Sequence, residues 1–171
     1  FDMNILKLAE DYEDIHFILS KDTKMSPNFM KKHGIPERAK KCIEYVIPDF
    51  NIDQIARSGQ CFRFRREEEG RYSLIAGGKW LDIEQNGETV RFSCTENEFE
   101  GFWRDYFDLN ADYGRYKSKV AKRDAYLRAA VETGSGLRIL RQELWETIIC
   151  FIISQQNNIP RITKCVDGLC T

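Results

Sequence analysis

The chain has 171 residues, of which 42% are hydrophobic and 12% aromatic. This is enough apolar side chain to bury a core, and it excludes a disordered protein. The 26 basic and 27 acidic residues give a net charge of -1 at pH 7, which excludes a general positive field that would attract nucleic acid. Any nucleic-acid contact must therefore come from a local patch.

The cysteines and histidines argue against a metal centre. None of the six cysteines forms a Cys-x-x-Cys pair, so we expect reduced thiols rather than a zinc site. Only His16 and His33 are available, too few for a histidine-rich metal site. No apolar run approaches the ~18 residues that a membrane span needs. We expect a cytoplasmic protein with no metal, cofactor or membrane partner.

Residues 1 to 46 are predicted to be helical and charged. Residues 36 to 46, "PERAKKCIEYV", are predicted as a second helix with Pro36 in its first turn. Pro48 closes this segment, and "NIDQIA" predicts a short helical turn that stops near Gly59. The first helix of the segment is predicted from the spacing of Ile5, Leu8, Tyr12 and Ile15.

Between Cys61 and Cys94 the hydrophobic residues tend to recur at every second position. The runs "CFRFR", "YSLIA", "KWLDIE" and "TVRFSC" predict strands separated by turns. Asn86-Gly87 is typical of a type I′ hairpin turn. We expect an antiparallel meander whose core is covered by Phe62, Phe64, Trp80, Val90 and Phe92.

Helices are predicted after the strands. Thr95 and Glu98 have the spacing of a capping box. The helix that follows places aromatic residues at helical spacing, which predicts core packing rather than base stacking; these are Phe99, Phe102, Trp103 and Tyr106.

Two further helices are predicted before the end of the chain. "RDAYLRAAVET" predicts a helix that ends at Gly134, and "LWETIICFIIS" is apolar on nearly every face. The second is therefore expected to be a central helix of a helical layer. Strands followed by helices indicate an α+β arrangement or two abutting domains.

Four consecutive amide side chains follow the apolar run, in "CFIISQQNNIPRI" (150 to 162). One interpretation is a helix stop and a helix cap, with Asn157 or Asn158 capping a helix that has Pro160 in its first turn. That helix would have an apolar side of Ile159, Ile162, Val166 and Leu169.

The alternative interpretation is contact with nucleic acid. Amides carry both donors and acceptors for base edges, and Arg161 can donate two parallel hydrogen bonds. A local basic patch close to the loop in sequence would consist of Arg138, Arg141, Arg161 and Lys164.

Several motifs resemble the 8-oxoguanine DNA glycosylase (OGG) family in the same order and with similar spacings. They are "SGQCFRF" (58 to 64), "DYFDLNADY" (105 to 113) and "GLRILRQELWETIICFIISQQNNIPRI" (136 to 162). The resemblance runs from about Ile47 to Thr171, and the first 46 residues do not share it. It implies an antiparallel sheet with helices, TATA-binding-protein-like, followed by the first helices of an all-α helix-hairpin-helix glycosylase domain.

The resemblance also implies roles for individual residues, because these enzymes act on a base rotated out of the duplex. Gly59 matches the glycine whose backbone carbonyl accepts from the N7–H of 8-oxoguanine. Asn157 and Asn158 match two asparagines of the loop that fills the gap and contacts the partner base. Arg161 matches the arginine that reads the partner cytosine.

Two departures from the family pattern stand out. Gln156 occupies the position of the family's wedge asparagine, with one more methylene and torsion. The family's nucleophilic lysine and assisting aspartate have no matching position in residues 47 to 171, so we expect no catalytic residue within this chain. The segment 33 to 45 faintly resembles a hairpin motif, but its Arg38 cannot form an imine.

The sequence thus predicts three segments: a helical segment over 1–46, an OGG N-terminal-like α+β domain over 47–134, and the incomplete start of the helical domain over 135–171. We expect the N-terminal portion of a bacterial-type glycosylase and AP lyase that excises 8-oxoguanine opposite cytosine in damaged double-stranded DNA. We expect a monomer, and this portion is expected to be inactive alone.

Two other functions are compatible with the residues alone. The first is a non-catalytic DNA-binding or interaction module that keeps the scaffold without the reaction. The second is a nuclease that uses Glu67, Glu68 and Glu69, which is disfavoured because an acidic run in a hairpin turn is ordinarily solvated.

Overall fold

The computed structural model describes residues 42–120 and 122–169. These residues fall into two compact units, one of residues 42–74 and 81–141 and one of residues 75–80 and 142–169. The helices predicted before residue 42 lie outside the described residues. Within the described ranges, no helix is long and apolar enough to cross a membrane.

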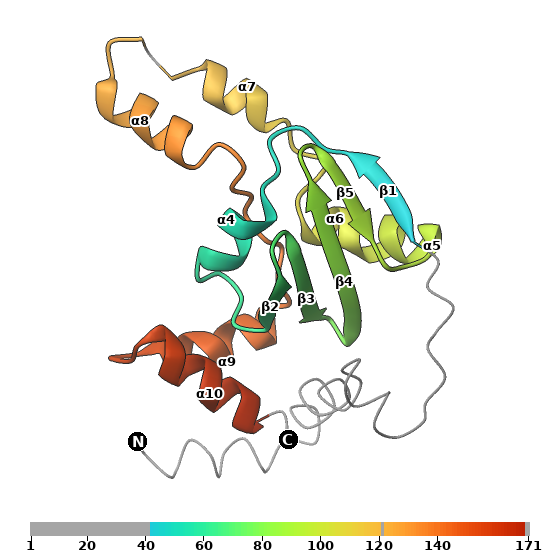
Figure 1. Cartoon of the computed structure of the whole chain (residues 1–171). Helices are drawn as coiled ribbons and strands as arrows, with labels where there is room; N and C mark the ends of the chain where they lie inside the picture. Colours follow the sequence, from blue (N-terminus) through green and yellow to red (C-terminus); the bar gives the residue numbers. More distant parts are fainter. Residues whose placement is uncertain (1–41, 121, 170–171) are drawn as a thin grey trace. The chain divides into compact units, whose positions relative to one another are not determined.

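A five-stranded antiparallel sheet is the main β element, in the order β1-β5-β4-β3-β2 (Figure 1). Strands β2 to β5 are neighbours in chain order, so the predicted meander is confirmed. The edge strand β2 has a bulge between Arg66 and Glu68. The strands are β1 (Ile43–Val46), β2 (Phe64–Glu68), β3 (Arg71–Ala76), β4 (Lys79–Asn86) and β5 (Thr89–Phe92).

Strand β1 corrects the helix predicted over residues 36 to 46. Residues 43 to 46 pair antiparallel with β5, from Ile43 opposite Phe92 to Val46 opposite Thr89. Ile43 and Tyr45 are half-buried, whereas the residues between and after them are exposed. This alternation, in a run of β-branched and aromatic residues, suits a sheet edge. The part of the predicted helix before residue 42 lies outside the described chain.

The hairpin turns also differ from the type I′ turn predicted at Asn86-Gly87. Asn86 pairs with Thr89, so the two turn residues are Gly87 and Glu88. Gly87 has a φ of 60° and Glu88 has no positive φ, which matches the φ pattern of a type II′ turn. A type I′ turn needs positive φ at both central residues. That pattern occurs instead at Gly77 and Gly78, with φ of 53° and 69°.

The predicted core is partly confirmed. Val90 and Phe92 are fully buried, whereas Phe62, Phe64 and Trp80 are only half-buried. Phe62 precedes β2 and Phe64 begins it, so neither sits in the middle of the sheet. The buried strand positions that the prediction lacked include Tyr72, Leu74, Leu81 and Ile83.

The helix after β5 is confirmed together with its capping box. Thr95 Oγ1 accepts from the Glu98 N–H at 3.2 Å, and a Glu98 carboxylate oxygen accepts from the Thr95 N–H at 3.0 Å. The helix runs as α5 (Glu96–Glu98), a π-helical turn η1 (Phe99–Trp103) and α6 (Arg104–Tyr106).

The aromatic stripe of this helix belongs to the core, as predicted. Phe99 and Trp103 are each 1% exposed. Phe99 stacks on Tyr45 of β1 with ring centroids 4.5 Å apart, and it lies 4.8 Å from Phe92 of β5. Phe102 is half-buried.

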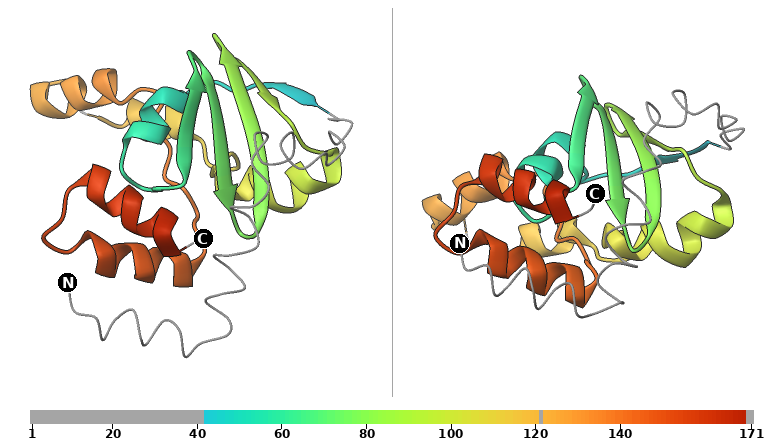
Figure 2. Two further views of the ribbon diagram at one scale, coloured as in Figure 1. Left: turned by 60° about the horizontal axis from the view of Figure 1, so that its bottom comes forward. Right: turned by 90° about the horizontal axis from the view of Figure 1, so that it is seen from below.

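Five further helices complete the described chain. The short α4 precedes β2, α7 and α8 follow the sheet (Figure 2), and α9 and α10 form a helical pair. The predicted helices over 123–133 and 144–154 are confirmed. Their bounds are α4 (Ile52–Arg57), α7 (Tyr113–Ser118), α8 (Ala125–Thr133), α9 (Leu144–Ser154) and α10 (Ile159–Leu169).

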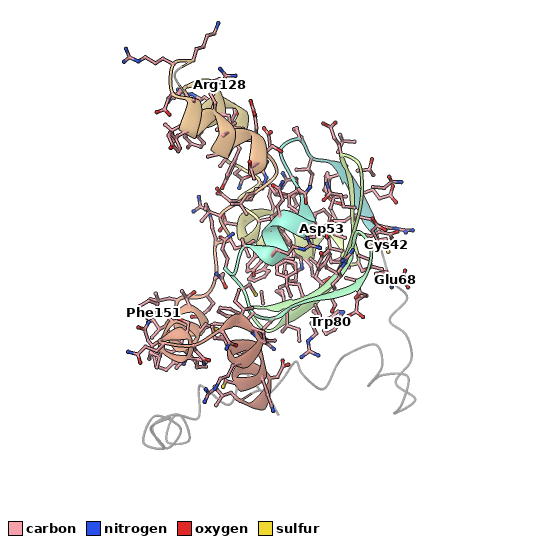
Figure 3. All side chains as sticks on the ribbon, turned by 60° about the vertical axis from the view of Figure 1, so that its left-hand side comes forward. Cys42, Asp53, Glu68, Trp80, Arg128 and Phe151 are labelled. Atoms are coloured by element: carbon pink, nitrogen blue, oxygen red, sulfur yellow. The ribbon has the colours of Figure 1, made fainter. Side chains whose placement is uncertain are left out.

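The burial of α9 differs from the prediction of a central helix. Only Glu146 and Ile153 are buried, and Phe151 is 66% exposed. Figure 3 labels Phe151 on this helix. Of the apolar side chains of α9, only that of Ile153 is therefore buried among the described residues.

The Arg138 side chain connects several segments of the larger unit through hydrogen bonds. It is 4% exposed, and its guanidinium donates to the carbonyls of Pro48 and Asp49 at 3.1 Å and of Asp108 at 2.9 Å. It also lies 4.6 Å from the ring centre of Tyr113. Burial lowers the pKa of Arg138, while Tyr113 and the two aspartates act in the opposite direction.

Gly136 should not tolerate a side chain. Its carbonyl accepts from the Asn51 N–H at 2.8 Å, and an added Cβ would lie 2.6 Å from that nitrogen. We expect Gly136→Ala to lower the free energy of unfolding by about 1 to 3 kcal/mol, since overpacking displaces backbone. The matched control is Gly101→Ala, where a Cβ meets nothing within 4 Å. Equal melting curves for the two variants would contradict this close approach.

Candidate nucleic-acid interface

Gly59 lies between α4 and β2 in a left-handed backbone conformation, with a φ of 76°. An added Cβ would meet no atom within 4 Å. The glycine is therefore required by backbone conformation rather than by crowding within the chain. This geometry is consistent with a turn glycine and also leaves open space beside the backbone.

Hydrogen bonds fix the chain on both sides of Gly59. Ser58 caps α4, and its hydroxyl donates to the Ile55 carbonyl at 2.7 Å. The Gln60 amide donates to the Arg138 carbonyl at 2.9 Å and accepts from the Leu140 N–H at 2.9 Å. The segment around Arg138 thus positions the glycine through Gln60.

Helix α4 is itself held by polar contacts from two directions. The Gln85 side chain of β4 accepts from the Ile52 N–H and donates to the Phe50 carbonyl, each at 2.8 Å. From the other direction, Gln54 accepts from the Gly136 N–H at 2.9 Å. The orientation of Gly59 therefore depends on both the sheet and residues 136–140.

The amide loop begins by satisfying the last turn of α9. Gln155 donates its side-chain amide to the Phe151 carbonyl at 3.2 Å. Asn157 donates to the Ile153 carbonyl at 3.1 Å. The Phe151 carbonyl also accepts from the Ser154 hydroxyl at 2.7 Å. The two amides thus bind carbonyls of the last helical turn and act as a helix stop.

The other end of the loop begins α10. Asn158 Oδ1 accepts from the Arg161 N–H at 3.1 Å, and the Asn158 carbonyl accepts from the Ile162 N–H at 2.9 Å. This is the predicted helix cap, with Asn158 as the capping residue. On the predicted apolar side Ile162 and Val166 are buried, Leu169 is half-buried, and Ile159 is 58% exposed.

Gln156 differs from its neighbours. It is exposed, and its φ of 52° is unusual for a residue other than glycine. Within residues 42–120 and 122–169 no hydrogen bond involves its side chain. The tip of the loop therefore presents one amide that is free to contact a ligand.

One residue of the predicted basic patch is buried. Arg138 is buried and bound to backbone carbonyls, so its inclusion was wrong: a guanidinium with several donors can replace solvent with main-chain oxygens. Arg141 Nε lies 2.8 Å from the Asp108 carboxylate. Arg161 and Lys164 are exposed on α10.

The acidic run is not arranged as a metal site. Glu67 and Glu68 belong to β2, and Glu67 accepts from the Ser73 hydroxyl at 2.6 Å. Among the described residues no group of three or more His, Cys, Asp or Glu side chains is arranged to hold a metal ion.

Comparison with known proteins decides the family. The profile described as "8-oxoguanine DNA glycosylase, N-terminal domain" matches residues 43–148. The chain belongs to this family. The match begins at Ile43, so it includes strand β1 and starts before the position 47 at which the resemblance was expected to begin.

Solved structures agree with this assignment. The apo form of the Clostridium acetobutylicum 8-oxoguanine glycosylase/lyase is 40% identical, with a TM-score of 0.69, over 75% of this chain and 46% of that chain. The same enzyme in complex with dsDNA containing cytosine opposite to 8-oxoG gives the same identity and TM-score, over 75% and 44%. The fold is therefore an α+β domain followed by helices, as in these glycosylases.

Two curated relatives are also similar. An N-glycosylase/DNA lyase of Saccharomyces cerevisiae is 58% identical over 36 residues, which are 21% of this chain and 10% of the relative. The N-glycosylase/DNA lyase OGG1 of Arabidopsis thaliana is 28% identical over 116 residues, 64% of this chain and 32% of the relative. The chain therefore spans less than half the length of the proteins it matches.

Sequence reasoning did not identify Ser58 and Gln60 as positioning residues. They lie inside the "SGQCFRF" motif that carried the resemblance, which was the available signal. Ser58 binds the nearby Ile55 carbonyl. The partners of Gln60 lie 78 and 80 positions away in the chain, and no local pattern indicates such contacts.

Asn158 can be tested by separating its capping role from contact with DNA. We expect Asn158→Ala to lower the free energy of unfolding by about 1 kcal/mol through loss of the helix cap. Asn158→Ser keeps a capping oxygen and should retain most of that stability. Thermal unfolding followed by circular dichroism measures the difference, and equal losses in the two variants would contradict the capping role.

Proposed function

We propose that this chain is the N-terminal portion of a DNA glycosylase and AP lyase that excises 8-oxoguanine opposite cytosine. One observation carries the proposal: the chain is 40% identical to a glycosylase/lyase solved with dsDNA containing cytosine opposite to 8-oxoG. The proposed partner is damaged double-stranded DNA, bound by a monomer. In this proposal residues 47–134 are the OGG N-terminal-like domain, and residues 135–171 begin the helical glycosylase domain.

The local geometry supports a division of roles among the site residues. Gly59 would offer its backbone carbonyl to the N7–H of the flipped 8-oxoguanine, beside open space where a Cβ would meet no atom. The exposed amide of Gln156 would enter the vacated space in the duplex. Asn157 and Asn158 would hold the loop in shape while their remaining polar atoms face the partner base.

Arg161 is proposed to read the partner cytosine. It is exposed in the first turn of α10, where the Asn158 cap fixes its backbone. A guanidinium donates two parallel hydrogen bonds, which suits the acceptors of an unpaired base.

The nucleophile is proposed to lie outside this chain. The family attacks the sugar C1′ with a lysine, because a desolvated neutral amine is a nucleophile that yields an imine. No residue of the described site supplies that amine: Gly59 and the amide loop can bind and orient the base but cannot attack it. We expect the 171 residues to be inactive alone.

The activity is tested by single-turnover nicking of an 8-oxoguanine·cytosine duplex, with an undamaged duplex as the control. The product of the complete gene and the 171-residue chain are compared. Nicking by the longer product only is the expected result. Nicking by neither would favour a non-catalytic DNA-binding module, and nicking by the shorter chain would overturn the placement of the nucleophile.

Gly59→Ala should weaken the preference for 8-oxoguanine over guanine. A left-handed backbone conformation costs a residue with a Cβ roughly 1 to 2 kcal/mol. We therefore expect the backbone at position 59 to relax toward another conformation, which would turn its carbonyl away from the N7–H of the base. Loss of one hydrogen bond of about 1 kcal/mol corresponds to a ~5-fold loss of preference. The preference is measured as the ratio of dissociation constants for the two duplexes with the complete gene product.

The matched control for Gly59 is Gly87→Ala. Gly87 also has positive φ, 60°, and a Cβ there meets nothing within 4 Å. Its backbone strain is therefore similar, but it lies in the β4–β5 turn. An equal loss of preference in the two variants would show that instability, rather than the Gly59 carbonyl, is responsible.

Arg161→Ala should reduce discrimination for cytosine opposite the lesion by about 1 to 3 kcal/mol, the range for a bidentate base contact. The measurement is excision of 8-oxoguanine opposite each of the four bases by the complete gene product. The control is Lys164→Ala, a neighbouring exposed cation on α10. An Arg161 variant that keeps the wild-type ratios for all four bases would remove this assignment.

A further inference from the structure

Residues 113–120 and 122–128, called here the α7–α8 surface, have a charge balance unlike that of the whole chain. The segment "YGRYKSKVAKRDAYLR" contains six basic residues and one acidic residue, whereas the chain has a net charge of -1. The single acidic residue, Asp124, is occupied as the cap of α8, where it accepts from the Leu127 N–H at 3.0 Å. The positive charge of the segment is therefore not balanced from within.

Four of these cations are exposed and have no carboxylate partner in the described part of the chain. By contrast, Lys117 is 2.5 Å from the Asp49 carboxylate, and Arg128 is 4.0 Å from Glu132. The four are Arg115, Lys119, Lys122 and Arg123.

The segment also exposes aromatic side chains. Tyr126 is 92% exposed and Tyr116 is 61% exposed. Neither α7 nor α8 contains a buried residue. A solvated helix face is ordinarily built from interspersed charges of both signs. Exposed tyrosines among cations of one sign are instead typical of a surface that binds a partner.

The helices lead away from the sheet of the same unit. Figures 1 and 2 show α7 and α8 to one side of the sheet. Lys119, Lys122 and Arg123 lie between these two helices in the chain. Figure 3 labels Arg128 on α8, far from Asp53 of α4. A large partner therefore has access to this surface.

Phosphate groups suit this combination of side chains. Lysine and arginine neutralise phosphates, and tyrosine hydroxyls donate to phosphate oxygens as well. A membrane surface is less suitable, since a membrane-binding helix needs a large apolar face. Helix α8 instead has only Tyr126, Leu127 and Val131 as apolar side chains larger than alanine.

We propose that the α7–α8 surface binds the phosphate backbone of duplex DNA, independently of base sequence and of the lesion. The proposal rests on the proposed function, because it adds a second contact region to the same DNA partner. Contacts of this kind fix a protein on the duplex without reading bases. They would hold the protein on undamaged DNA while lesions are sought.

The test is a triple variant, Lys119→Gln, Lys122→Gln and Arg123→Gln, in the complete gene product. Its control is Arg66→Gln, Arg71→Gln and Arg91→Gln, which removes the same charge from exposed positions on the sheet. None of the six residues is buried, so both variants are expected to keep the wild-type melting temperature.

The measurement is the salt dependence of binding to an undamaged duplex and to an 8-oxoguanine·cytosine duplex. Each lost phosphate contact reduces the slope of log K against log salt by about 0.9. On both duplexes we expect the slope of log K against log salt to be shallower by about 2 to 3 in the triple variant than in the wild type. The ratio of its binding constants for the two duplexes should be unchanged. The control should keep the wild-type slope.

The outcomes separate this proposal from the proposed function. Wild-type slopes in the triple variant would overturn the proposal that the α7–α8 surface binds DNA. They would leave the glycosylase assignment intact. A reduced slope in a protein with no lesion preference would support the surface and count against the glycosylase. Tighter wild-type binding to phosphatidylserine vesicles than to duplex, lost in the triple variant, would overturn the proposal in favour of a membrane.

Discussion

The buried guanidinium of Arg138 joins segments that are distant in the chain. Its donors reach carbonyls before α4 and after α6, and two of these belong to Asp49 and Asp108. Both aspartates have positive φ, 55° and 51°, a conformation that needs surrounding support. Their carboxylates are bound as well, to Lys117 and to Arg141. A buried charge with strong hydrogen bonds thus holds two unfavourable turns in place.

This arrangement links the stability of the domain to the candidate site. Residues on either side of Arg138 bind Gln54, which lies within α4, and Gln60, which follows Gly59. A change that loosens Arg138 would therefore shift the backbone at Gly59 without touching it. The amide loop likewise combines structural contacts with an exposed side chain. Gln155, Asn157 and Asn158 bind the helix ends, and Gln156 is exposed at the tip.

Much of the fold was predictable from local patterns. The period-two runs gave β2 to β5, and the capping box and amide residues gave helix boundaries, because these signals act over a few residues. Strand β1 was missed because its pairing partner lies almost fifty residues away. The burial of Arg138 was missed for the same reason, since an arginine is ordinarily exposed and only the fold reveals its carbonyl partners. Gly59 and Arg161 were identified through the family pattern, whereas their supporting contacts required the structure.

The two outer strands of the sheet differ from its centre in a way that affects behaviour in concentrated solution. Strand β1 has only four residues and is followed closely by Pro48. Strand β2 is bulged between Arg66 and Glu68, and its outer positions carry charges of both signs. Short, bulged and charged edges resist pairing with another chain. Association at high concentration is therefore expected to involve exposed apolar side chains of α9, such as Phe151, rather than growth of the sheet into cross-β fibres.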